Sequence, residues 1–110
     1  MDPKQIYIAA NHMSRQVKWE LVNGDEWFFV GANEEFNVEE FQKIATGFFG
    51  EMPLYIVIDR NNVIESTCYE LSDELAKIPR DIDILITSQN HRKIIQINKI
   101  GVARKGNYEN

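Results

Sequence analysis

The chain has 110 residues and no stretch that resembles a linker, so we expect residues 1–110 to form a single domain. One cysteine, and an N-terminus without the basic and apolar segments of a signal peptide, predict a cytoplasmic protein without disulfides. No apolar run approaches the roughly twenty residues of a transmembrane helix, and we therefore expect no membrane-spanning role.

The net charge is −5, and the two signs are segregated along the chain. Residues 20–40 carry seven carboxylates and no lysine or arginine, whereas residues 84–108 carry five basic side chains and no carboxylate. Such segregation steers charged partners, and it also arises when two parts of one sheet neutralise each other.

The first fifteen residues fit two structures. Asp2 and Pro3 resemble the N-cap and first position of a helix, whereas the segment Ile6-Tyr7-Ile8 is typical of a strand. We favour a strand over residues 4–9, and the helix stays open as the alternative.

The pair Asn23-Gly24 predicts a two-residue hairpin turn between strands over residues 16–22 and 25–31, with Val22 opposite Asp25. One face of this hairpin then carries an apolar, core-facing set: Val17, Trp19, Leu21, Phe28 and Val30. The other face mixes charged side chains with aromatic ones: Lys18, Glu20, Asp25, Trp27 and Phe29. This register predicts a buried Trp19 and a Trp27 nearer to solvent.

A helix is predicted over residues 36–49. Asn37 is its N-cap with Glu40 as the reciprocal partner, and Phe36 is placed to pack on Phe41. At 100° per residue its apolar side chains fall within an arc of roughly 140°, which indicates a helix lying on a sheet.

The remaining segments complete the prediction. Residues 52–58 form a buried central strand, 63–69 its return strand, 71–78 a short helix, and 82–87, 93–97 and 100–104 further strands, with a frayed tail after Lys105. The predicted fold class is α+β, a single domain with a mainly antiparallel sheet of about five to seven strands, one amphipathic helix packed on a face and one short helix.

Few residues suggest chemistry. The glycines match no phosphate-binding loop, and His12, His91 and Cys68 have no metal-ligand spacing, so we expect no metal and no cofactor. We interpret Cys68 as a small buried hydrophobic residue inside a strand and not as a nucleophile. No catalytic set emerges, and we favour a protein that is not an enzyme.

Two alternative functions rest on polar segments. The turn at residues 88–92 could serve a small ligand or an enzyme through Ser88, Asn90, His91 and Arg92, although a solvated turn has the same composition. A basic C-terminal segment could contact nucleic acid through Arg92, Lys93, Lys99, Arg104 and Lys105. No aromatic residue is interleaved there, and lysines that protect an edge strand explain it better.

The acidic, aromatic segment favours protein binding. The candidate binding residues are Glu20, Asp25, Glu26, Trp27, Phe29, Glu35 and Glu39. Trp27 and Phe29 lie on the face opposite the predicted core set, so that either another element covers them or they anchor a partner. We favour an inhibitor or immunity-type protein that binds a basic partner such as a nuclease toxin; homo-oligomerisation stays open.

Overall fold

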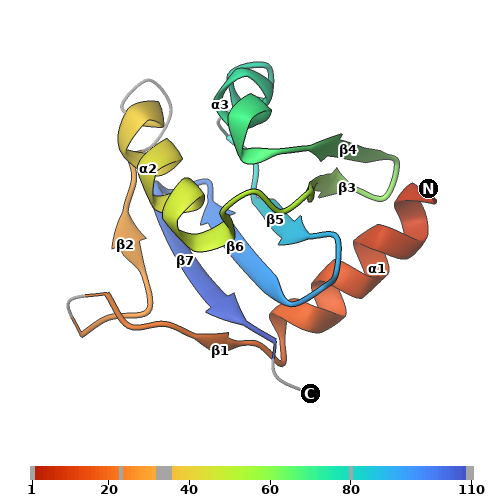
Figure 1. The fold of residues 1–110 in the computed structure, drawn as a ribbon, viewed down its shortest axis with the longest axis horizontal. Helices are drawn as coiled ribbons and strands as arrows, with labels where there is room; N and C mark the ends of the chain where they lie inside the picture. Colours follow the sequence, from red (N-terminus) through yellow and green to blue (C-terminus); the bar gives the residue numbers. More distant parts are fainter. Residues whose placement is uncertain (1, 23, 32–35, 80, 109–110) are drawn as a thin grey trace.

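The computed structural model of the chain describes residues 2–22, 24–31, 36–79 and 81–108. An antiparallel sheet separates helices on its two sides (Figure 1). The strands are β1 (Lys18–Trp19), β2 (Phe28–Phe29), β3 (Leu54–Asp59), β4 (Asn62–Ser66), β5 (Ile84–Ser88), β6 (Lys93–Asn98) and β7 (Val102–Asn107). Their order is β1-β7-β6-β5-β3-β4, and β2 also pairs with β7. This architecture confirms the predicted α+β class and number of strands.

Helices α2 (Val38–Phe49) and α3 (Cys68–Ala76) cover one side of the sheet, which we call the closed face. Helix α1 (Pro3–Ser14) lies on the opposite side, which we call the open face. The side chains of the sheet alternate between the two. Closed-face positions include Leu54, Ile56, Ile86, Ile95, Ile97 and Ala103, and open-face positions include Tyr55, Val57, Leu85, Ile94, Gln96 and Arg104.

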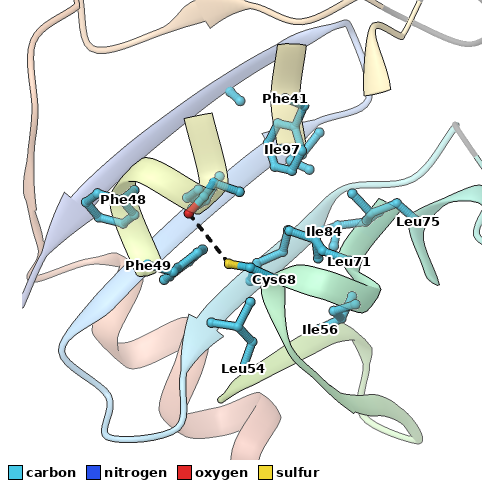
Figure 2. Close-up of a cluster of buried hydrophobic side chains, with 14 of the residues drawn as sticks. Phe41, Phe48, Phe49, Leu54, Ile56, Cys68, Leu71, Leu75, Ile84 and Ile97 are labelled. Atoms are coloured by element: carbon cyan, nitrogen blue, oxygen red, sulfur yellow. Dashed lines mark hydrogen bonds between the residues drawn. The ribbon is translucent and has the colours of Figure 1, made fainter. Parts of the chain in front are cut away.

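The main hydrophobic core fills the closed face (Figure 2). Phe41 and Phe49 of α2 and Leu71 of α3 are almost fully buried against the isoleucines of the central strands. Cys68 lies in the same cluster, where its thiol donates to the backbone oxygen of Ala45 at 3.6 Å. It behaves as a buried hydrophobic residue, as predicted, but from the start of α3 and not from a strand.

The helical alternative is the correct one for the N-terminus. Asp2 caps α1 by accepting a hydrogen bond from the backbone nitrogen of Lys4, and Ile6, Ala10 and Met13 are buried. The favoured strand over residues 4–9 is therefore wrong. The local β preference lost because helical spacing buries these three side chains against the sheet, which outweighs a small difference in propensity.

The α2 prediction is confirmed over Val38–Phe49, with the backbone nitrogen of Glu40 donating to Oδ1 of Asn37 at 3.0 Å. The Phe36 and Phe41 rings also meet, with centroids 5.6 Å apart. The other hydrogen bond of the predicted cap, from the Asn37 backbone nitrogen to the Glu40 side chain, does not form. That nitrogen donates to the carbonyl oxygen of Val30 instead.

After α2, one hairpin lies at a different place in the sheet than predicted, and two boundaries differ from prediction by more than two residues. The β3–β4 hairpin lies at one edge of the sheet and not at its centre. Helix α3 begins at Cys68, so the return strand ends at Ser66 instead of Tyr69. Strand β7 continues to Asn107, because β6 and β1 pair with its last residues; the predicted frayed tail is shorter.

Candidate functional site: the open face beside strand β7

Strands β1 and β2 form one interrupted edge strand. Trp19 pairs with Gly106 and Phe28 pairs with Ala103, so both segments run antiparallel along β7 in the same direction. Between them the chain leaves the sheet edge. The predicted hairpin forms only at its tip, as the bridge between Val22 and Asp25, and the predicted pairing of its two arms is wrong. Asn23 itself lies outside the described residues.

This pairing also redistributes the apolar residues of the segment. Phe28 and Val30 join the closed-face core, whereas Val17 and Trp19 join a cluster on the open face. Leu21 is 68% exposed. The predicted core-facing set is thus divided between two sides of the sheet, because a long-range partner, β7, replaced the local one.

Arg104 organises the open face at this edge. Its guanidinium carbon lies 3.9 Å from the centre of the Trp19 ring and 4.4 Å from that of Trp27. Its Nη1 donates to Oε1 of Glu26 at 3.0 Å, and its Nε donates to Oε1 of Gln96 at 2.9 Å. Trp19 and Trp27 therefore flank one cation on the same face, which corrects the prediction that they point to opposite faces.

Phe29 presents an apolar surface beside this stack. It pairs with Val102 on β7, and its side chain is 75% exposed on the open face. Asp25 and Glu26 are both exposed in the loop that precedes it. Aromatic side chains and carboxylates thus share one edge of the molecule.

The other predicted binding residues lie elsewhere. Glu20 interacts with closed-face side chains, through Nζ of Lys105 at 3.9 Å and Nδ2 of Asn107 at 3.2 Å. Glu39 is in the first turn of α2, in the layer on the other side of the sheet. Glu35 lies outside the described residues. The structure therefore brings together Asp25, Glu26, Trp27 and Phe29, but not Glu20 or Glu39.

The polar turn at residues 88–92 is largely occupied by its own hydrogen bonds. Ser88 is fully buried, donates to Oδ1 of Asn90 at 2.6 Å and accepts from the backbone nitrogens of Arg92 and Lys93. His91 has a left-handed backbone with φ of 58°. Its Nδ1 is buried without a partner among the described residues, and its ring lies 6.5 Å from that of Tyr55. The arrangement indicates a structural turn more than a ligand site.

The basic segment does not present its cations together. Lys93 donates from Nζ to the backbone oxygen of Phe48 at 2.8 Å, Lys105 pairs with Glu20, and Arg104 is enclosed by the two tryptophans. Arg92 and Lys99 remain exposed. Three of the five charges are thus used within the protein, which weakens the case for phosphate binding.

A groove between α1 and the open face was missed by the sequence reasoning. It has a volume of about 240 Å³ and is lined by Tyr7, Asn11, Ser14, Val57, Ile58, Asp83, Leu85 and Gln96. The three α1 residues follow helical i, i+4 and i+7 spacing. This polar stripe would have been visible in the sequence if the helical alternative had been chosen.

Among the described residues, the groups with a perturbed pKa lie outside this surface. Burial raises the pKa of the Cys68 thiol, which opposes thiolate formation. A hydrogen bond to Glu51 raises the pKa of Tyr69, and hydrogen bonds from Asn62 and the backbone of Asn61 lower that of Asp59 in the β3–β4 turn. These shifts accompany local structure and single out no catalytic pair.

Comparisons of the chain with protein-family models, with curated proteins and with solved structures found no match. In the described residues, no three histidine, cysteine or acidic side chains gather as metal ligands would. None of the helices in the described ranges has the length and apolar character needed to cross a membrane.

Proposed function

We propose that this chain is a small acidic binding module, of the inhibitor or immunity type, that binds a basic protein partner such as a nuclease toxin in the cytoplasm. The observation that carries the proposal is the exposure of Phe29, 75%, beside Trp27 and next to Asp25 and Glu26. An exposed phenylalanine next to a half-buried tryptophan offers apolar area that gains from removal from water, which favours a protein-binding surface.

The charges of this surface favour a basic partner. Arg104 is the cation in contact with Trp27, but its side chain is only 21% exposed and is paired with Glu26, whose side chain is 47% exposed. Asp25 and Glu26 therefore face solvent more than the guanidinium does. A nuclease carries positive charge to hold phosphate, so a negative surface is complementary to its site and accelerates encounter.

The aromatic residues have a different task from the carboxylates. Arg104 restrains Trp27 through a stacking contact and through its hydrogen bond to Glu26, which precedes Trp27 in the chain. An anchor that is ordered before binding loses less conformational freedom in the complex. Trp27 and Phe29 would therefore slow dissociation, whereas the carboxylates would mainly set the association rate.

The test uses the partner captured from the native host, with association and dissociation rates measured for single variants. Phe29→Ala is expected to raise the dissociation rate by at least about tenfold, and Asp25→Lys to lower the association rate and its salt dependence. Matched controls lie on α3: Tyr69→Ala for the exposed aromatic, at 77% exposure, and Asp73→Lys for the carboxylate. Equal effects of the α3 variants and the open-face variants would overturn the proposal.

A further inference from the structure

The groove between α1 and the sheet continues the surface described above. Leu85, Gln96 and Arg104 are aligned across β5, β6 and β7 by the strand register. Gln96 lines the groove, and its Oε1 accepts the hydrogen bond from Arg104. The groove and the Trp27–Arg104 stack therefore adjoin on one face, within reach of a single partner.

The lining of the groove has an apolar part and a polar part. Val57 and Leu85 contribute aliphatic surface from the sheet, and Tyr7, Asn11 and Ser14 contribute polar groups from α1. Asp83 is the only charged residue among the described residues that line it. This combination suits an elongated ligand with an aliphatic stem and a positively charged end.

The hydrogen bonds within the groove leave three of its side chains with the capacity to accept, beside donors on Tyr7 and Gln96 that have no partner among the described residues. Asn11 uses its Nδ2 to donate to the backbone oxygen of Tyr7, and Ser14 uses its hydroxyl proton to donate to the backbone oxygen of Asn11. The Asn11 Oδ1 and the Ser14 hydroxyl oxygen therefore retain the capacity to accept. Asp83 accepts one hydrogen bond, from the backbone nitrogen of Lys99 to Oδ1, and takes part in none of the ion pairs in the described part of the chain.

We propose that this groove binds a lysine or arginine side chain of the partner, with the aliphatic stem against Val57 and Leu85 and the cation toward Asp83. The proposal rests on the proposed function, which supplies the basic partner. An ammonium or guanidinium group donates several hydrogen bonds and accepts none, so it can bond to the Asp83 carboxylate and to the free oxygens of Asn11 and Ser14. The groove's volume of about 240 Å³ is many times the roughly 10–15 Å³ in which a single water fits, so it leaves room for a long side chain.

The test needs no partner, because isolated side-chain analogues serve as probes. The full chain, labelled with ¹⁵N, is titrated with N-acetylarginine amide and N-acetyllysine amide, and with N-acetylnorleucine amide as the uncharged analogue of similar length. At least one cationic probe is expected to cause saturable shifts in the side-chain amide signals of Asn11 and Gln96. The norleucine analogue should bind at least about threefold more weakly, because it lacks the charge-assisted hydrogen bonds.

Two matched variants test whether Asp83 is the carboxylate that binds the cationic probe. Asp83→Asn keeps an oxygen for the hydrogen bond from Lys99 and should weaken binding of the cationic probe about threefold to tenfold. Asp81→Asn removes an exposed carboxylate two residues away that does not line the groove, and it should leave binding unchanged. Unshifted backbone signals of α1 in the free Asp83→Asn protein verify that its fold is intact.

Three results would overturn the inference: no saturable shift with either cationic probe, equal binding of the norleucine analogue, or equal effects of the two asparagine variants. None of these results bears on Phe29, whose variant tests the proposed function by partner kinetics. Conversely, an inert Phe29→Ala would refute the Trp27–Phe29 anchor, whether or not the probe binds in the groove.

Discussion

The two faces of the sheet belong to the same strands but are covered by different helices and to different extents. On the closed face, α2 and α3 cover the central strands, and the aromatic side chains Phe41 and Phe49 are at most 2% exposed. On the open face, α1 covers the strands toward β3 and β4, while Phe29 and Trp27 stay accessible to solvent beside β7. Apolar side chains are buried on both faces, but on the open face Phe29 and part of Trp27 stay exposed beside β7.

This difference shows why aromatic content alone does not locate a binding surface. Most phenylalanines between residues 28 and 49 belong to the closed-face core, and only Phe29 is mainly exposed among those that the structure describes. The cost of removing an aromatic ring should therefore differ greatly between the faces. Stability measurements can establish that difference before any partner is known.

The largest expected effect comes from a matched pair of truncations. Phe41→Ala, at 1% exposure, should lower the free energy of unfolding by about 3–5 kcal/mol, because it removes a buried ring and leaves a cavity. Phe29→Ala, at 75% exposure, should cost less than about 1 kcal/mol. Urea denaturation of both variants measures the contrast, and similar losses would show that Phe29 is part of the stabilising core.

A second pair tests the interrupted edge strand. A Cβ atom added at Gly106 would lie 2.7 Å from the backbone oxygen of Lys18 and from Cγ1 of Val17, so Gly106→Ala should force β1 away from β7. We expect a loss of about 1–3 kcal/mol. Gly47→Ala, where nothing lies within 4 Å, should instead stabilise α2 by about 0.5–1 kcal/mol. If Gly106→Ala is neutral in thermal unfolding, the β1–β7 pairing described here is incorrect.

A smaller effect is expected at the start of α2 on the closed side. Asn37→Ala removes the side-chain acceptor for the Glu40 backbone nitrogen and should cost about 1 kcal/mol. Asn37→Asp, which retains an acceptor and favours the positive end of the helix dipole, is the control and should preserve stability. An unchanged denaturation midpoint for Asn37→Ala would contradict the cap.

The smallest energetic effect, but a clear optical one, is expected at Arg104. Arg104→Met keeps an unbranched side chain yet removes the charge held between Trp19 and Trp27, and should cost about 1 kcal/mol or less. Quenching of tryptophan fluorescence by acrylamide should increase, because the indoles lose a common stacking partner. Lys77→Met, which removes an exposed lysine of the α3 C-cap, is the control. Identical quenching of both variants would show that Arg104 does not order the tryptophans.

The sequence predicts most reliably those features that depend on neighbouring residues. The Asn37 cap of α2 and the Val22–Asp25 turn are of this kind, and both are present. The pairing of β1 and β2 with β7 could not be read locally, because Trp19 and its partner Gly106 lie far apart in the chain. For the same reason, the contact of Arg104 with Trp19 and Trp27 could not be predicted from the sequence.

The N-terminal segment was misread for a different reason. Ile6 and Ile8 have a local preference for strands, but Ile8 is 55% exposed in α1 while Ile6 is buried against the sheet. The buried face of a helix, not the preference of each residue, decided the structure. Since α1 forms one wall of the groove, this error is also the reason why Asn11 and Ser14 were not predicted as binding residues.

Site-specific photo-crosslinking tests the central claim, that the partner binds the open face beside β7, most directly. Benzoylphenylalanine is placed at Phe29 or, as a control of equal exposure on the other side of the sheet, at Tyr69; the two native side chains are 75% and 77% exposed. The account predicts that the probe at position 29 crosslinks to the captured partner and that the probe at position 69 does not. Crosslinking from position 69 without crosslinking from position 29 would contradict it.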